Sequence, residues 1–475
     1  MNGVSDIGLM ASAKAVAAWR LTCVSALLHF LVDGLCVCCL YLVAGVSSLA
    51  GLAGVFIAYN VLAFLTQPLT GMLADRLAHR WQLLWLSALL LSAAVAVASL
   101  GMLAVGGSAP MGVLLLVAVL LGLGNSLFHV WGGKEVAMAT GNDIRALGVF
   151  VSTGAFGLAV GVALHSWWAL FVLLTLFVGL VAAGGATGTA AGTQGTAADA
   201  TGTAVGAMGT AADATGTAAR GGAAVGRLSW VVVLLMMGFV LLRSFAGETL
   251  SAALQPVALL PLLVGGVAMV GKAAGGWVAR GLGWWQALLL LTVATASCVL
   301  WRHGAAVIPW AGLLLVNATM AVTLWLANRA MPRREGLTFG LLAAALMPGY
   351  LLAQAVGDDR LAVVPWLLAT LVPTIVLELL VLWLLRERRA DVLWSSVVVN
   401  MLTNVPLNLF VTFVSHSWTT ILVAEVFIVA VEALWYRYFV DSWRQATAYS
   451  VLCNGISFFT GLLVQLVFML FDFIH

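Results

Sequence analysis

The sequence predicts an all-α polytopic membrane protein with two six-helix halves and three further transmembrane helices. Of its 475 residues, 63% are hydrophobic and only 8% are charged, whereas an ordinary soluble domain carries about 25% charged residues. The mean hydropathy of +1.10 over the whole chain leaves too few polar residues to cover a soluble surface. This composition argues against a soluble enzyme, a disordered protein and a nucleic-acid-binding protein. The net charge of +3 is also too small to suggest a nucleic-acid partner.

Fifteen apolar segments are long enough to cross a lipid bilayer, which takes about 20 residues per helix. The first twelve lie at approximately 21–43, 50–71, 81–105, 110–131, 145–166, 167–185, 229–249, 257–280, 284–301, 307–328, 336–357 and 362–385. Three more follow at 392–414, 419–437 and 446–473. The first apolar segment is itself long enough to span, so we expect no cleaved signal peptide.

The basic residues support this count and give it an orientation, because cytoplasmic loops hold the Lys and Arg residues of membrane proteins. With the N-terminus inside, all 21 Lys and Arg residues fall on the inner side or at its edge except Arg243, Arg302 and Arg360. The odd number of spans then places the C-terminus outside. We expect a multi-pass protein of the cytoplasmic (plasma) membrane.

Residues 184–226 consist of Gly, Ala and Thr with scattered Asp, and residues 195–204 recur at 209–218. Such a segment has no core-forming side chains, which predicts a flexible linker. An ordered solenoid is the alternative, but two copies cannot bury a core. The predicted division is a six-helix bundle at 1–183, the linker at 184–226, a second six-helix bundle at 227–389 and a three-helix module at 390–475.

The cysteines do not indicate disulfides or a cofactor site. Four of the six lie in the first apolar segment, where they act as small hydrophobes: Cys23, Cys36, Cys38 and Cys39. Metal binding there is the alternative, but no His-rich stretch supports it. We therefore expect no metal and no cofactor, and the lack of a Gly-rich phosphate-binding loop argues against an ATP-driven pump.

Short motifs recur in the same order in the two halves, which indicates an internal duplication. The matching pairs are Leu27-Leu28-His29 with Leu241-Leu242-Arg243, Gly71-x-x-Ala74 with Gly276-x-x-Ala279, Trp81-Gln82 with Trp285-Gln286, Asn125 with Asn317, and Gly148 with Gly340. Transporters built from such repeats hold the substrate between the repeats, near the middle of the membrane.

The loop after the second segment, Gly71-Met-Leu-Ala-Asp75-Arg76-Leu-Ala-His79-Arg80, resembles the signature loop of the major facilitator superfamily. The resemblance implies that Gly71, Asp75, Arg76 and Arg80 form an inner latch of alternating access. Asp75 would pair with a basic residue or with a helix N-terminus of another span. The alternative is an ordinary charged inner loop. The copy at Gly271–Arg280 lacks the Asp, which puts a latch role for it in doubt.

Within that superfamily, Asn125-Ser-Leu-Phe128-His129 is similar to a stretch of the fosmidomycin-resistance branch of efflux transporters. Val130 departs from that pattern, because the branch often has Pro after the His. The superfamily resemblance covers residues 17–385 and implies a twelve-helix bundle of two pseudo-symmetric halves. It leaves the three-helix extension unexplained.

Ionisable and amide residues inside the spans are candidates for the transport pathway, because they are costly in lipid. The candidates are His29, Asp33, Asn125, His129, Arg243, Glu248 and Asn317. His29 and Asp33 lie four residues apart on one helix face, and we expect Arg243 to face them across a central cavity. Asp33 is the candidate proton carrier. A fixed ion pair that fastens the two halves together is the alternative.

In the last three segments, Asn400, Asn404 and Asn408 form one polar stripe and Glu425 and Glu432 another. We expect these stripes to meet one another, or an oligomer or partner, through packing contacts. An ion path is the alternative.

The predicted function is secondary active transport of a small molecule by alternating access, coupled to protons. An efflux or antiporter role is implied only by the branch resemblance. The main alternative is a non-transporting membrane scaffold or sensor on the same fold. An intramembrane lipid-modifying enzyme using His29, Asp33 and His129 is less favoured, because no nucleophile motif accompanies them. The prediction is therefore that the protein is not an enzyme.

Overall fold

The chain is described by a computed structural model. Its backbone covers all residues except 1, 45–48, 78–80, 105–109, 203–226, 257–258, 358–362, 414–416 and 475, and its side chains cover residues 12–43, 55–77, 81–103, 110–184, 228–256, 259–353, 371–404, 407 and 417–460. The described part contains helices and no strand. Eleven helices or continuous helical runs in it are long and apolar enough to cross a membrane. The prediction of an all-α polytopic membrane protein is confirmed.

The first half contains six spans. They are α1 (Asn2–Ala44), the run of α2 (Leu49–Asn60), η1 (Val61–Leu65) and α3 (Gln67–Arg76), then α4 (Trp81–Ala104), α5 (Met111–Ala139), α6 (Ile144–Ala163) and α7 (Trp167–Gly202). The α7 helix continues into the segment read as a linker. The remainder, 203–226, lies outside the described residues, so the flexible linker stays a prediction.

The second half and the extension follow in the predicted order. They are α8 (Arg227–Ala252), α9 (Leu260–Leu282), α10 (Trp284–Leu300), α11 (Val307–Ala330), the pair α12 (Glu335–Ala344) and α13 (Leu346–Gly357), α14 (Val363–Leu384), α15 (Ala390–Phe413), α16 (Trp418–Phe439) and α17 (Trp443–Ile474). Each of the fifteen predicted segments corresponds to one helix or one interrupted run, because backbone in lipid must satisfy its hydrogen bonds within the helix.

The two halves meet through two pairs of helices in equivalent positions. α3, at the end of the second span, packs along α12 of the eleventh, and α6, the fifth span, packs along α9, the eighth. The second span of each half therefore lies against the fifth span of the other. A Cβ on Gly71 would overlap the Gly336 carbonyl oxygen, so this approach requires glycine. The prediction of a two-halved bundle is confirmed by this arrangement.

The second span is interrupted where it passes the centre of the bundle. η1 is a short π-helix followed by Pro68, which lacks the N–H that a regular helix would use there. Side chains replace the missing backbone bonds: Thr66 Oγ1 donates to the Leu62 carbonyl at 2.5 Å and Gln67 Nε2 donates to the Ala63 carbonyl at 2.8 Å. Such π-segments are often found at functional sites.

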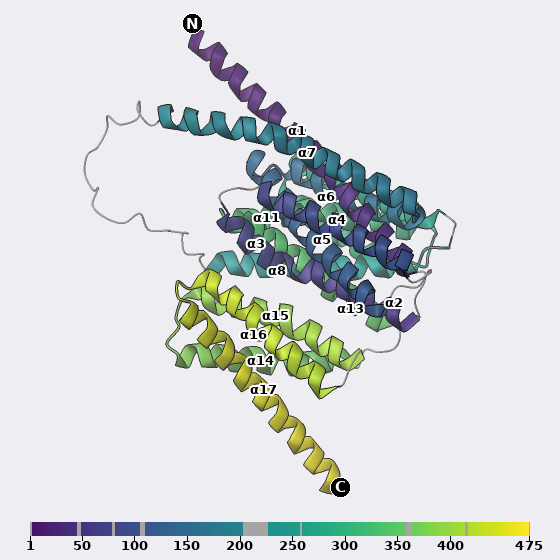
Figure 1. The fold of residues 1–475 in the computed structure, drawn as a ribbon, viewed down its shortest axis with the longest axis vertical. Coiled ribbons are helices and arrows are strands. Elements are labelled where there is room, and N and C mark those ends of the chain that lie inside the picture. The colour runs from purple at the N-terminus through teal and green to yellow at the C-terminus, as the bar shows by residue number, and fades with distance from the viewer. Residues whose placement is uncertain are drawn as a thin grey trace, which may run out of the picture.

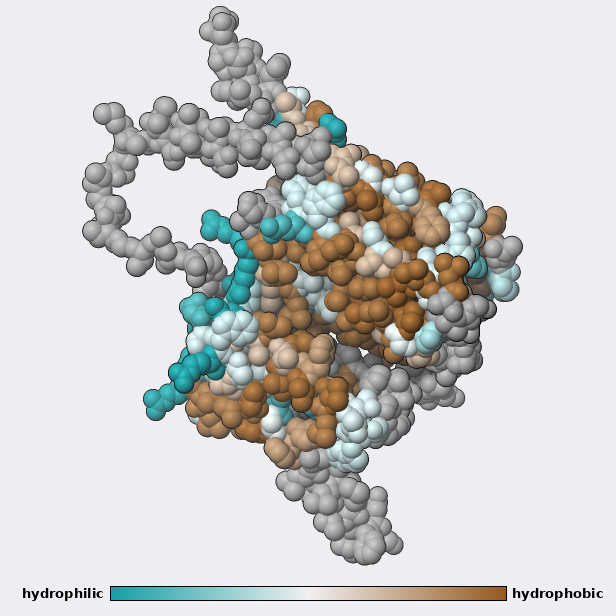
Figure 2. Space-filling view, viewed as in Figure 1, coloured by the Kyte–Doolittle hydropathy of each residue, from teal (hydrophilic) through white to brown (hydrophobic). Residues whose placement is uncertain are grey.

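The surface has the distribution expected of a protein embedded in lipid. Figure 2 shows hydrophobic residues over the flank of the helices and hydrophilic residues gathered at one end. Arg76 and Arg334, at the ends of α3 and α12, both stack on the Tyr438 ring at the end of α16. The predicted orientation assigns this end to the cytoplasm.

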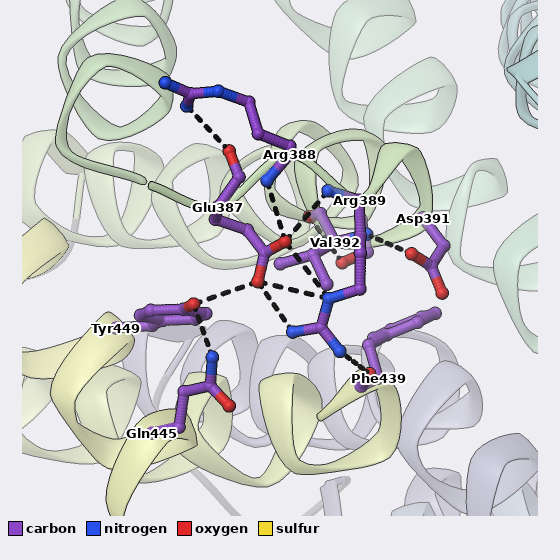
Figure 3. Close-up of polar contacts among 9 residues, drawn as sticks. Glu387, Arg388, Arg389, Asp391, Val392, Phe439, Gln445 and Tyr449 are labelled. Atoms are coloured by element: carbon purple, nitrogen blue, oxygen red, sulfur yellow. Dashed lines mark hydrogen bonds and ion pairs between the residues drawn. The ribbon is translucent and has the colours of Figure 1, made fainter. Parts of the chain in front are cut away.

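The three added helices pack with α14 as a group against one side of the bundle (Figure 1). A buried carboxylate at the junction fastens them, and Figure 3 shows its contacts. Glu387, between α14 and α15, accepts hydrogen bonds from the Arg389 guanidinium at 2.6 Å and from the Tyr449 hydroxyl of α17 at 2.9 Å. Arg389 also donates to the Phe439 carbonyl at the end of α16. One ion pair therefore joins three helix ends.

Acid should loosen this junction. Burial raises the pKa of Glu387, but hydrogen bonds from Arg389 and Tyr449 and the charge of Arg389 outweigh it and hold the pKa at about 2, below the ordinary 4.5. A carboxyl with a lowered pKa stabilises the fold above its ordinary pKa, and this contribution is lost as pH falls towards the folded value. We expect the Tm of the protein in detergent to fall from pH 4.5 to 2, and Glu387→Gln to remove part of that dependence. Asp441→Asn, at an exposed carboxyl, is the control. If the Tm of Glu387→Gln depends on pH in the same way as the Tm of the unmodified protein, Glu387 does not stabilise the junction.

Candidate substrate and proton site

A cavity of about 240 Å³ lies between the two halves. The first half lines it with residues of α1, α2, η1, α3, α5 and α6, and the second half with residues of α8, α9, α11, α12 and α13. Its lining includes Leu40 and Leu158 in the outer parts of their spans and His129 and Phe339 in the inner parts. The cavity therefore lies around the middle of the bundle. This is the position predicted for a substrate site between repeats.

Asp33 stands at the centre of a buried polar cluster in the wall of this cavity. Its Oδ1 accepts a hydrogen bond from Asn125 Nδ2 at 3.0 Å. His29 Nε2 lies 3.3 Å from Oδ2, and His129 Nε2 lies 3.5 Å from Oδ1. Only 6% of Asp33 is exposed. The structure thus brings together four of the predicted pathway residues, from α1 and α5.

Backbone carbonyls fix the two imidazoles in one orientation. His29 Nδ1 lies 2.8 Å from the Phe150 carbonyl oxygen, and His129 Nδ1 lies 2.9 Å from the Asn125 carbonyl oxygen. A carbonyl can only accept a hydrogen bond, so each Nδ1 must carry the hydrogen. In the neutral ring each Nε2 is then a bare acceptor that faces a carboxylate oxygen.

Two acceptors at such distances repel each other unless a cation lies between them. A proton on Nε2 meets this need, and so does a metal ion, because the ligand atoms of His29, Asp33 and His129 lie within 4.8 Å of one another. Gly154 of α6 leaves the space open, since a Cβ there would overlap both His29 Nε2 and Asp33 Oδ2. The cluster is therefore chemically suited to bind and release a proton or a small cation.

The second half contributes positive charge to the same cavity. Arg243 of α8 and Lys272 of α9 both line it. Arg243 is only 9% exposed, and its Nε has no hydrogen-bond partner. Among the described residues, neither cation forms an ion pair with a carboxylate. Arg243 and Asp33 line this cavity from different halves. The alternative, a fixed ion pair between them, is absent from the contacts of the described residues, because His29, His129 and Asn125 occupy the carboxylate.

Two predicted pathway residues stand apart from the cavity lining. Asn317 of α11 donates to the Leu313 carbonyl of its own helix at 2.8 Å. Glu248 is half-buried near the end of α8. Their pathway roles stay predictions. Lys272, Tyr59 and Gln67 line the cavity but were not predicted, and Lys272 could have been recognised from its position ten residues before the end of α9 at Leu282.

The predicted latch residue Asp75 contacts the opposite half directly. Its two carboxylate oxygens accept the backbone N–H groups of Gly336 and Leu337, each at 2.9 Å, at the start of α12. Lys134 of α5 lies 3.3 Å from Asp75 Oδ1 and donates to the Ala74 carbonyl at 2.5 Å. A carboxylate is favoured at a helix N-terminus, where free N–H groups and the helix dipole are positive. The residue thus has both kinds of partner considered from the sequence.

The other latch residues differ in their contacts. Gly71 packs on the Gly336 backbone. Arg76 turns to the added module, where it donates to the Arg437 carbonyl at 3.0 Å and stacks on the Tyr438 ring at 4.7 Å. Arg80 lies outside the described residues. Lys134 was not predicted as a latch residue, because its partner lies on another span.

No family model and no curated protein matches the sequence. Among solved structures, the chain is similar to a bacterial homologue of the iron transporter ferroportin in the outward-facing state, with 17% identity, coverage of 71% of this chain and 91% of that chain, and a TM-score of 0.46. It is also similar to the Escherichia coli fucose:proton symporter FucP, with 14% identity, coverage of 72% and 91%, and a TM-score of 0.49. A third is a bacterial homologue of the human lysosomal transporter Spinster, with 12% identity, coverage of 93% and 98%, and a TM-score of 0.39.

Proposed function

We propose that the protein is a secondary active transporter of the cytoplasmic membrane that moves a small molecule by alternating access. The observation that carries this proposal is a cavity between two six-helix halves, with a carboxylate–histidine cluster from one half and two cations from the other. In this proposal the Asp75 contacts with the start of α12 hold the latch end of the two halves together.

The coupling ion in this proposal is a proton held by Asp33, His29 and His129. Each Nε2 is oriented towards the carboxylate by a carbonyl bond at its Nδ1, so a proton can be shared between ring and carboxylate without moving a helix. A bound substrate would change the electrostatic field in the cavity and so change the affinity of the Asp33 cluster for its proton. Binding of the substrate and binding of the proton would then be coupled.

The substrate in this proposal is a small anion. Arg243 and Lys272 line the cavity without a carboxylate partner among the described residues, and buried charges of this kind require one. A carboxylate or phosphonate group would supply that partner through charge-assisted hydrogen bonds. The proton would remain with Asp33 and its histidines on the opposite wall.

A divalent transition-metal cation is the second candidate substrate. Two imidazoles and one carboxylate are a common ligand set for such ions, and hydrogen bonds at Nδ1 orient ligating histidines in the same way. The positive charges of Arg243 and Lys272 disfavour it, because they would repel a further cation in the same cavity. Binding measurements separate the two candidates.

Asp33→Asn should abolish transport driven by a pH gradient, because the amide cannot carry the proton. Exchange of substrate down its own gradient should survive, since the amide mimics the protonated acid in size and polarity. Flux into proteoliposomes with and without an imposed pH gradient measures both, using the anion found by the screen below. Asp441→Asn is the matched control and should behave as the unmodified protein. Full pH-driven flux in Asp33→Asn would exclude proton coupling at this residue.

Lys272→Met should weaken anion binding by about tenfold or more, the size of one charge-assisted hydrogen bond. A thermal-shift screen of purified protein against small carboxylates, phosphonates, amines and divalent metal salts identifies the ligand class, since a ligand of the folded state raises the Tm. Lys14→Met, at an exposed lysine of α1, is the control. The metal candidate is favoured if Mn²⁺ or Zn²⁺ raises the Tm, if substitution of His29 or His129 removes this rise, and if no anion raises the Tm. Saturable binding without flux in proteoliposomes would favour the sensor alternative.

Asp75→Asn should open the latch end, because an amide loses one backbone hydrogen bond and the Lys134 ion pair. Loss of charge-assisted bonds of about 1.5–3 kcal/mol each shifts a two-state equilibrium by tenfold or more. Spin labels at Leu73 of α3 and Arg329 of α11, in a cysteine-free background, report the separation by pulsed electron paramagnetic resonance. We expect a larger population at long distance. An unchanged distance distribution would contradict the latch role.

A further inference from the structure

Three arginines meet where the two halves and the added module come together. Arg76 ends α3 in the first half, Arg334 precedes α12 in the second half, and Arg437 lies in the last turn of α16 in the module. Arg76 and Arg334 lie over the Tyr438 ring, at 4.7 Å and 5.4 Å from its centroid. Arg76 also donates to the Arg437 carbonyl oxygen at 3.0 Å. Three parts of the protein therefore bring positive charge to one place.

The three guanidinium groups repel one another and lack acidic partners. The charges of Arg334 and Arg437 act against that of Arg76. Within the described part of the chain, none of the three forms an ion pair with a carboxylate. Two buried nitrogens, Arg334 Nη1 and Arg437 Nε, also have no hydrogen-bond partner. Buried polar atoms are nearly always paired, so these nitrogens are free to donate to an acceptor from outside the protein.

The acids near the arginines are engaged elsewhere or exposed. Asp75 accepts two backbone N–H groups of α12. Glu335 accepts the backbone N–H of Arg333 at 3.1 Å. Asp441 attracts Arg76 but is exposed and forms no ion pair with it. An external anion would therefore meet three positive charges whose donors are in part unused.

An apolar cavity of about 240 Å³ begins beside the arginines, on the same two helices. Leu69 of α3 lines it, and Arg76 follows seven residues later on the same helix face. Trp435 of α16 also lines it, and Tyr438 follows three residues later on the same face. From Leu69 back to Val61 the wall extends about two helical turns, or about 10 Å. The cavity thus runs from the arginines towards the middle of the bundle.

The cavity opens on the flank of the protein. Phe427 of α16 lines it and is 62% exposed. Apart from two threonines, the lining consists of aliphatic and aromatic side chains of the second span, α15 and α16. In a membrane this flank is surrounded by acyl chains, so an acyl chain is the apolar group that reaches the cavity.

We propose that an anionic phospholipid binds at this junction, with its phosphate on Arg76, Arg334 and Arg437 and one acyl chain in the cavity between the second span and the module. Guanidinium groups bind phosphate through charge-assisted hydrogen bonds, and basic pockets between transmembrane helices hold acidic lipid headgroups. A free phosphate ion offers the same charge but leaves the apolar cavity unfilled. The lipid would join both halves and the module at a site separate from the central cavity.

Native mass spectrometry of the full-length protein tests the headgroup, with dioleoyl phosphatidylglycerol and dioleoyl phosphatidylcholine as probes. The two lipids have the same chains, and only the first has a net negative charge. We expect tighter binding of phosphatidylglycerol. Arg334→Gln should weaken that binding about tenfold, the size of one charge-assisted hydrogen bond, and leave phosphatidylcholine unaffected. Arg329→Gln, at an exposed arginine that also stacks on a tryptophan, is the matched control.

Ala424→Phe tests the acyl chain, because Ala424 lines the end of the cavity that is farther from the arginines along α16. Filling this end should weaken binding of dioleoyl phosphatidylglycerol. Dihexanoyl phosphatidylglycerol should bind as before, since its short chains do not extend that far. Ala430→Phe, at an exposed position of the same helix, is the control.

The proposal is overturned if phosphatidylcholine binds as tightly as phosphatidylglycerol, or if Arg334→Gln binds phosphatidylglycerol as the unmodified protein does. It is also overturned if Ala424→Phe leaves binding of the dioleoyl lipid unchanged. A thermal-shift measurement with inorganic phosphate distinguishes a free anion. A rise in Tm that Arg334→Gln removes, that Lys272→Met retains and that phosphatidylglycerol does not reproduce would assign the arginines to free phosphate and overturn the lipid site.

Discussion

A charge within the hydrocarbon core is stable only beside a partner or water, and the interior of this protein is organised around that constraint. The flanks are apolar, and two clusters of ionisable groups lie inside the described spans. Asp33 and its histidines face Arg243 and Lys272 across the central cavity, and Glu378 and Glu432 lie within the added module. The first cluster lines the central cavity. At the second, Thr403 lines another cavity and donates a hydrogen bond to Glu432.

The two halves contribute different chemistry although they share a pattern of helices. The first half supplies the acid and both imidazoles, whereas the second supplies the cations. Glycines bring the backbones close enough to enclose a cavity between them, and Gly154 keeps the space next to Asp33 free. In the proposed function, the two halves would use this difference to hold the substrate and the coupling proton on opposite walls of one cavity.

The number and order of helices could be predicted from the sequence because each span is a long apolar run bounded by charge. The spacing of His29 and Asp33 also predicted their shared face, and Asn125 and His129 were recognised on the fourth span. Their mutual distances could not be predicted, since they depend on how closely α1, α5 and α6 pack. The alternative of a direct Asp33–Arg243 ion pair fails for that reason. Lys272 was missed although it lies within the predicted eighth span, because the motif matched there belongs to the inner loop of the first half.

The Asp75 contact has a consequence for which substitutions the protein can accept. The acceptor is the Asp75 side chain, and the donors are the two backbone N–H groups of residues 336 and 337. Backbone donors are present whatever residue occupies those positions, proline excepted. Sequence drift at Leu337 can therefore leave the bond intact, whereas drift at Asp75 removes it. A Cβ on Gly336 would lie 2.7 Å from Asp75 Oδ1, so related chains that keep this contact should keep the glycine and the acid and vary at Leu337 within the limits of packing.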